Sequence, residues 1–134
     1  MKPIIDVKNL NKSYTTAAND LVVLKNLTLS IPKGQFLSIT GRSGSGKSTL
    51  LYQLGLLDTP DSGEMNIDGT NVSVLDNNER TNFRLNKLGF VFQDYALIPD
   101  LTAIENVMLP LLMQGLNHRE AHAKALVAIE RIGL

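Results

Sequence analysis

The stretch GRSGSGKSTL, from Gly41 to Leu50, constrains the fold of this chain more than any other feature. Residues 41–48 satisfy the pattern G-x-x-x-x-G-K-[ST], directly after the apolar run FLSIT and before a helical pattern. Small residues let successive backbone N–H groups point into one concavity, where the N-terminus of the following helix adds its dipole. The stretch therefore predicts a strand, a phosphate-binding loop and a helix in succession within an α/β fold.

The side chains of this loop indicate a nucleoside triphosphate held with Mg²⁺. Lys47 is suited to reach the β- and γ-phosphates as a point charge, and the Ser48 hydroxyl can complete a Mg²⁺ shell. Arg42 is expected to point to solvent. The predicted nucleotide-binding residues of the loop are Gly41, Arg42, Ser43, Gly44, Ser45, Gly46, Lys47, Ser48 and Thr49.

The motif alone does not identify the base. Guanine-specific sites use N-K-x-D, but the Asn-Lys pairs here are followed by Ser13-Tyr14 and by Leu88-Gly89, so neither has the aspartate. Adenine is often held by stacking on an aromatic ring, and Tyr14 is the best-placed aromatic residue. A partly buried tyrosine at a strand end is the alternative interpretation of Tyr14.

Length, charge and cysteine content restrict the class of protein. A chain of 134 residues with 43% hydrophobic and 19% charged residues is typical of one globular domain. Its 13 basic and 13 acidic residues balance, so no overall field favours nucleic acid or anionic lipid. Cysteine is absent, which suits a reducing cytosol, and the apolar run 107–113 is far shorter than a membrane span. These features predict a cytosolic protein.

Periodicity and turn signals place the remaining elements. Strands are expected over residues 4–10, 21–31, 35–40, 64–67 and 88–92, with TTAAND as a hairpin loop. Helices are expected from Gly46–Lys47, after Asp76, after Thr102 and after Asn117, each of the last three caps being followed by a glutamate three residues on. Pro110 should kink the third helix or cost it a backbone bond, and Gly133 should cap the fourth.

Two apolar stripes suggest that the last two helices pack together. The first comprises Ile104, Val107, Met108, Leu111 and Leu112, and the second comprises Ala125, Ala128, Ile129 and Ile132. His118 and His122 have a metal-compatible spacing, but the sequence offers no evident third ligand, so a metal site there is disfavoured.

Over essentially its whole length the chain resembles the nucleotide-binding domain of an ABC transporter. NLNKSY resembles the A-loop, with Tyr14 as the adenine-stacking residue, and VLKNLTLSIPKGQFLSITGRSGSGKSTLL resembles the run into the Walker A loop. LLDTPDSGEMNIDG resembles the segment after the phosphate-loop helix, and LGFVFQDYALIPDLTAIENVMLPLL resembles the Q-loop and the start of the helical subdomain. Within the superfamily, the chain is similar to the branch of lipoprotein-releasing, macrolide-export and antimicrobial-peptide-export ATPases through the motifs FVFQ, LTAIENV and LPLL.

The resemblance implies an α/β fold with a P-loop NTPase (RecA-like) core, an antiparallel β-subdomain and the start of a helical subdomain. It implies that Gln93 binds Mg²⁺, orients the attacking water and responds to the membrane partner, so that Lys47 and Gln93 are the catalytic candidates. Residues Leu97, Ile98, Leu101, Val107 and Met108 either line the groove for that partner or belong to the core.

The implied function is ATP binding and hydrolysis coupled to export or extraction of a substrate through a membrane permease. The implied partners are that permease, as a subunit or a fused domain, and a second ATP-binding subunit, without nucleic acid. The implied location is cytoplasmic, peripheral on the cytoplasmic face of the cell membrane. The exported substrate is not readable, because the membrane subunit selects it.

Residues 1–134 contain no counterpart of the family's signature, Walker B aspartate, general-base glutamate or switch histidine. The chain is therefore interpreted as a partial, incomplete ATP-binding domain, expected to bind ATP weakly, to hydrolyse little or none and to expose an apolar edge. Two alternatives stay open: a non-hydrolysing remnant or interaction fragment, and a non-transport ATPase of the superfamily serving DNA repair or chromosome organisation. The balanced charge and the lack of coiled-coil or zinc modules disfavour the second.

Overall fold

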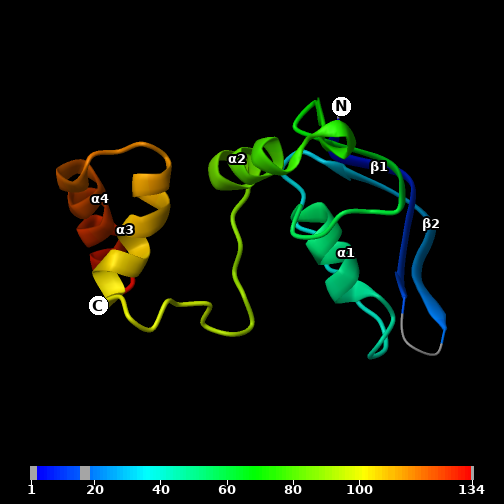
Figure 1. The fold of residues 1–134 in the computed structure, drawn as a ribbon, viewed down its shortest axis with the longest axis horizontal. Helices are drawn as coiled ribbons and strands as arrows, with labels where there is room; N and C mark the ends of the chain where they lie inside the picture. The colour runs from blue at the N-terminus through cyan, green and yellow to red at the C-terminus, as the bar shows by residue number, and fades with distance from the viewer. Residues whose placement is uncertain (1–2, 16–18, 134) are drawn as a thin grey trace. The chain divides into compact units, whose positions relative to one another are not determined.

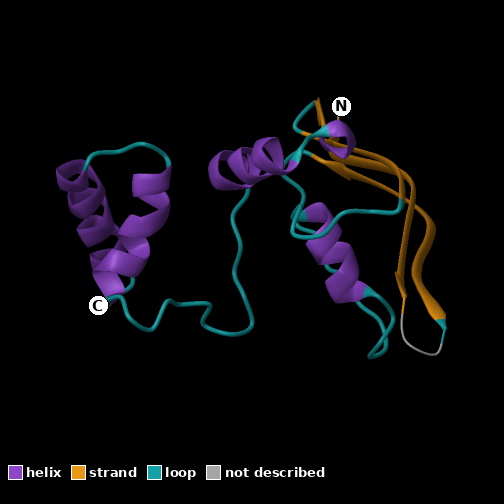
Figure 2. Ribbon diagram, viewed as in Figure 1, coloured by secondary structure: helices purple, strands orange, loops and turns teal. Residues whose placement is uncertain are grey.

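A computed structural model describes residues 3–15 and 19–133, which fall into two compact units, residues 1–81 and 82–134 (Figure 1). The first unit contains the sheet and α1 (Lys47–Leu54), and the second contains α3 (Ala103–Met113) and α4 (His118–Arg131). Helix α2 (Asn77–Lys87) includes the division between them. Figure 2 shows strands only in the first unit.

The first unit is built on a long antiparallel hairpin. β1 (Pro3–Thr15) pairs with β2 (Asp20–Pro32), from Pro3 opposite Pro32 to Thr15 opposite Asp20. Both predicted strands are confirmed and extend beyond their expected bounds; part of the predicted hairpin loop, residues 16–18, lies outside the described residues. The ladder has irregularities near Asn9 and Asn26, whose φ angles are 50° and 47°. Asparagine tolerates this left-handed conformation better than most residues, which suits it to bulges.

Two further strands complete a sheet of order β2-β1-β3-β4. β3 (Ser62–Ile67) pairs antiparallel with β1 and then with the short β4 (Thr70–Asn71), which leads into the 3₁₀ turn η1 (Val72–Val74). The turn between them is Asp68-Gly69, with φ angles of 49° and 79°. Two successive positive φ angles are the requirement of a tight hairpin turn, so the predicted turn at this dipeptide is confirmed.

The core of this unit lies between the sheet and α1. Its buried apolar side chains come from β1, β2, β3, α1 and the segments that follow them: Val7, Leu10, Leu24, Ile31, Leu50, Leu54, Leu56, Met65, Ile67 and Val72. α1 begins where the glycine pattern placed it, at Lys47, and ends at Leu54.

The strands predicted over residues 35–40 and 88–92 are not present. Both segments lack helix and strand, and their side chains are largely exposed, with Phe36 97% accessible. Within the described residues neither segment pairs with another strand, so no ladder satisfies its backbone N–H and C=O groups. The prediction was wrong because an apolar run becomes a strand only when a neighbouring strand satisfies its backbone.

The predicted N-terminal helix caps are confirmed. At α2 the Glu79 backbone N–H donates to Asp76 Oδ1 over 2.8 Å, and the Asp76 N–H donates to Glu79 Oε2 over 2.9 Å. Thr102 and Glu105 form the same reciprocal capping box at α3, and the Glu120 N–H donates to Asn117 Oδ1 over 3.0 Å at α4. At the other end of α4 the C-cap is Ile132, one residue before the predicted Gly133, which has a φ of 81° and donates its N–H to Glu130 O.

Helices α3 and α4 pack on each other in the second unit (Figure 1). Met108, Ala121 and Ala125 are buried, with Ile104, Val107, Leu111 and Leu116 against them. The predicted stripe of α3 is confirmed except at the partly exposed Leu112, whereas on α4 Ala128 and Ile132 are exposed, so the buried face turns toward Ala121. Pro110 lies inside α3, which continues to Met113. Among the described residues no helix combines the length and apolar character needed to cross a bilayer.

Candidate nucleotide-binding site

The glycine-rich loop folds tightly ahead of α1. Gly44 and Gly46 have φ angles of 77° and 90°, and the Ser45 N–H donates to Arg42 O over 3.2 Å. A Cβ on Gly46 would lie 3.0 Å from Val23 Cγ1 and 3.2 Å from Val23 O, so only glycine lets the loop approach β2 this closely. Gly46 is the N-cap of α1 and has no side-chain cap, and the first turn carries no acidic residue. The first N–H groups of α1 are thus left to an anionic ligand.

Lys47 places its charge inside the curve of the loop. Its Nζ donates to Gly41 O over 3.0 Å and to Arg42 O over 2.7 Å. The ammonium therefore lies among the loop's backbone groups, where the oxygens of a phosphate can replace the two carbonyls as acceptors. A Cβ on Gly41 would lie 2.7 Å from Ser45 Oγ, a side-chain hydroxyl that can rotate away.

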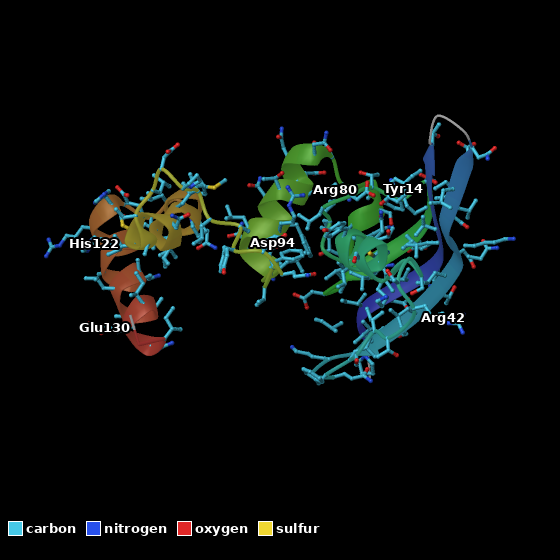
Figure 3. The ribbon with its side chains drawn as sticks, turned by 90° about the horizontal axis from the view of Figure 1, so that it is seen from below. Tyr14, Arg42, Arg80, Asp94, His122 and Glu130 are labelled. Carbon is cyan, nitrogen blue, oxygen red and sulfur yellow. The ribbon has the colours of Figure 1, made fainter. Side chains whose placement is uncertain are left out.

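Beside the loop lies a cleft of about 370 Å³ that β1, β2, the loop and α1 form together. Its lining residues are Tyr14, Leu21, Val23, Ser43, Gly44, Gly46, Lys47, Ser48 and Thr49. Tyr14, which Figure 3 labels, is 37% exposed, so part of its ring is open to a ligand. Phosphate-binding groups and an aromatic ring thus face one volume of the size that small-molecule sites have.

The Tyr14 ring is held by a network centred on Asp58, in the segment between α1 and β3. The Tyr14 hydroxyl donates to Asp58 Oδ2 over 2.8 Å, and Lys12 Nζ lies 3.0 Å from Asp58 Oδ1 and 5.0 Å from the centroid of the Tyr14 ring. Desolvation, followed by the bond to Asp58, raises the pKa of Tyr14. Burial alone would raise the pKa of Asp58, but the bonds from Lys12, Tyr14 and the Thr59 N–H lower it.

The other predicted site residues lie outside the cleft lining. Gly41 and Arg42 meet it only through Lys47, to which their carbonyls are bonded, and Ser45 is exposed. The prediction that Arg42 points to solvent is confirmed by its exposure. Gln93 is exposed, in a segment of the second unit without helix or strand.

Ser48 is the metal-binding candidate that lies in the cleft. Ser48 lies at the start of α1 and lines the cleft, where its hydroxyl fits the single protein ligand that Mg²⁺ commonly takes beside phosphate oxygens and waters. Over residues 3–15 and 19–133 no cluster of three or more histidine, cysteine or acidic side chains suited to a metal ion occurs. His122 is exposed on α4 (Figure 3).

Sequence reasoning missed several residues of this site. Leu21 and Val23 line the cleft because the hairpin register places Leu21 opposite Tyr14. Lys12 shares a strand face with Tyr14 through the period of two, a signal present in the sequence. Asp58 had no comparable signal, since its role depends on contacts with a strand more than 40 residues earlier in the chain. Gln53 enters the network through its bond to Asp58.

A glycine-rich loop ahead of a helix, with a lysine in its curve and an aromatic ring across one cleft, defines a phosphate-loop nucleotide-binding domain. The chain belongs to the ABC transporter family, whose model matches residues 24–134. Its similarity to solved ATP-binding cassettes shows an α/β cassette fold, present in part. One of them, the dimeric post-hydrolysis structure of the cassette MJ0796 bound to ADP and Pi, is 43% identical, with a TM-score of 0.86 over 94% of this chain and 56% of that chain.

Relatives of known class agree with this assignment. The lipoprotein-releasing system ATP-binding protein LolD of Pseudoalteromonas translucida is 44% identical over 131 residues, which are 98% of this chain and 56% of LolD. The pyoverdine export ATP-binding/permease protein PvdT of Pseudomonas fluorescens is 47% identical over 133 residues, which are 98% of this chain and 20% of PvdT. The chain thus spans little more than half of LolD and corresponds to part of an ATP-binding cassette. The branch inferred from FVFQ and LTAIENV is confirmed.

Proposed function

We propose that the cleft beside the glycine-rich loop binds ATP, with the triphosphate in the loop and the adenine against Tyr14. The observation that carries this proposal is the convergence of Tyr14, Lys47 and the uncapped N-terminus of α1 on one cleft. The loop N–H groups and the helix dipole stabilise the phosphate charge, and Lys47 adds a full positive charge. The base stacks on the accessible part of the Tyr14 ring.

The same proposal assigns the metal and the catalytic candidates. Ser48 would hold Mg²⁺ through its hydroxyl, and Gln93 would contribute a second oxygen and orient water, as the family resemblance implies. Bound Mg²⁺ would neutralise phosphate charge as the bond to the terminal phosphate breaks. Lys47 acts in binding and in stabilising the charge that develops on the phosphates. Residues 1–134 supply binding groups but no acidic general base among the residues assigned to the site.

In the cell we propose that this domain is the ATP-binding part of an exporter or extraction system. It would work with a membrane permease and a second ATP-binding subunit at the cytoplasmic face of the membrane. Two facts about relatives support this: PvdT is named as a combined ATP-binding and permease protein, and the MJ0796 cassette is dimeric in the structure with ADP and Pi.

Replacement of Lys47 tests the proposal directly. Lys47→Ala should weaken ATP binding about 10- to 100-fold, because a hydrogen bond to a charged group is worth roughly 1.5–3 kcal/mol. Isothermal titration calorimetry of the intact protein with ATP and Mg²⁺ measures the effect. Lys33→Ala is the matched control, since Lys33 is exposed in the turn after β2 and lies outside this cleft. Equal ATP affinity in Lys47→Ala and the unmodified protein would refute the proposed site.

A further inference from the structure

Three buried polar side chains of the first unit converge on one dipeptide. Within the described residues the buried polar or charged side chains are Lys12, Gln53 and Arg80, at 9%, 0% and 6% exposure. Gln53 Nε2 donates to Asp58 Oδ2 over 3.1 Å, and Arg80 donates to Asp58 O over 2.6 Å and to Thr59 Oγ1 over 2.9 Å. Lys12 Nζ donates to Asp58 Oδ1 and to Thr59 O over 2.7 Å. Burying three such side chains is costly unless their donors are used, so this convergence fixes the position of Asp58.

Asp58 thereby fixes the orientation of the Tyr14 ring. Its Oδ2 accepts the Tyr14 hydroxyl, while Lys12, bound to Oδ1, lies over one face of the same ring. The ring is thus held at its hydroxyl and on one face, while Tyr14 stays 37% exposed and lines the cleft. Asp58 does not line the cleft, so its influence on a ligand passes through Tyr14.

We propose that Asp58 is a positioning residue for nucleotide base recognition: it holds the Tyr14 ring in the stacking orientation and so sets the affinity for the base, without touching the nucleotide. This inference rests on the proposed ATP site. It separates the site into two parts, a phosphate part that the loop and Lys47 form, and a base part that depends on Asp58. A ring fixed before binding loses less entropy when the base stacks, which is the physical gain from the network.

The test compares ATP with tripolyphosphate, which presents phosphates without a base. In the intact protein, Asp58→Asn should weaken ATP binding about fivefold to tenfold, within the range that base–aromatic stacking contributes, and leave tripolyphosphate binding unchanged. Asp61→Asn is the matched control, because it removes a carboxylate three positions along the same loop that binds the Ser13 N–H over 2.6 Å and not the ring. The control should leave both affinities unchanged.

A double-mutant cycle shows whether Asp58 acts through Tyr14. Tyr14→Ala should lower ATP affinity, and adding Asp58→Asn to it should cause no further loss. If Asp58→Asn fails to fold, as circular dichroism would reveal, Tyr14→Phe replaces it. This variant keeps the ring and removes the hydroxyl that bonds to Asp58 and to Thr49. It should weaken ATP binding about two- to threefold, a bond-strength effect, with tripolyphosphate unaffected.

The outcomes separate the two proposals. An unmodified protein that binds neither ATP nor tripolyphosphate overturns the proposed function. Normal ATP binding with equal affinity in Asp58→Asn and Tyr14→Phe overturns only the positioning role. An equal loss of ATP and tripolyphosphate affinity also overturns it, because Asp58 would then support the phosphate loop or the fold and not the base.

Discussion

The β1–β2 hairpin and the apolar segments at residues 35–40 and 88–92 are similar in composition and opposite in outcome. All three contain the aliphatic and aromatic residues that strands prefer. The hairpin pairs along nearly its whole length and buries Val7, Leu10 and Leu24, whereas the two segments leave Phe36 and Val91 fully exposed or nearly so.

The difference lies in where the backbone partner is found along the chain. β1 meets an antiparallel partner after a short loop and a second one in β3, so its N–H and C=O groups are satisfied inside residues 3–67. Residues 35–40 and 88–92 have no such neighbour among the described residues. A strand that pairs in parallel needs a partner from far along the chain, joined by a crossover connection. Composition alone therefore identifies residues able to form a strand, and pairing decides which of them do.

The largest expected effect comes from truncating one side chain in the hairpin and one in residues 35–40. Leu10→Ala should lower the free energy of unfolding by about 2–5 kcal/mol, because Leu10 is 0% exposed and its loss leaves a cavity. Phe36→Ala removes a larger side chain that is 97% exposed and should change stability by less than about 0.5 kcal/mol. Chemical denaturation of the intact protein followed by circular dichroism measures both.

A cost for Phe36→Ala as large as that for Leu10→Ala would contradict the comparison. It would mean that residues 35–40 are packed against another part of the protein and that the segment is a paired strand in solution.

A second test concerns the close approach of β3 to β1 at Gly63. Gly63 has a φ of 108°, and a Cβ there would lie 2.6 Å from Asn9 O and 2.7 Å from Leu10 Cα. Gly63→Ala should therefore cost roughly 2–4 kcal/mol, from backbone strain together with steric overlap. Gly34→Ala is the control, since Gly34 has a φ of 81° with nothing within 4 Å and should show the strain alone. Equal unfolding midpoints for the two variants would show that the β1–β3 approach is looser than described.

The sequence predicts the local features well because their signals are local. The capping pairs Asp76/Glu79 and Thr102/Glu105, the turn at Asp68-Gly69 and the loop ahead of Lys47 each follow from a few adjacent residues. The Lys12–Asp58 pair joins residues 46 positions apart, and no periodicity encodes that contact. Contacts between distant residues also decide whether residues 35–40 and 88–92 pair as strands and whether Ile132 is buried. The sequence pattern around each of them therefore gave a wrong prediction.

The smallest expected effect is the loss of stability at low pH. It tests whether the side-chain contacts between Asp58 and β1 contribute to stability in addition to the backbone pairing of the strands. Because its pKa is lowered below the usual 3.8, Asp58 stabilises the fold above that value, and the contribution disappears as the pH falls through the lowered pKa. The loss should be below about 1 kcal/mol for a partly exposed ion pair.

The free energy of unfolding of the intact protein should therefore fall less steeply between neutral pH and about pH 2 in Asp58→Asn than in the unmodified protein. Asp94→Asn, which removes an exposed carboxylate in a segment without helix or strand, is the matched control. An Asp58→Asn profile parallel to that of the unmodified protein would show that the carboxylate titrates alike in the folded and unfolded chain, and that the ladder alone holds this part of the fold.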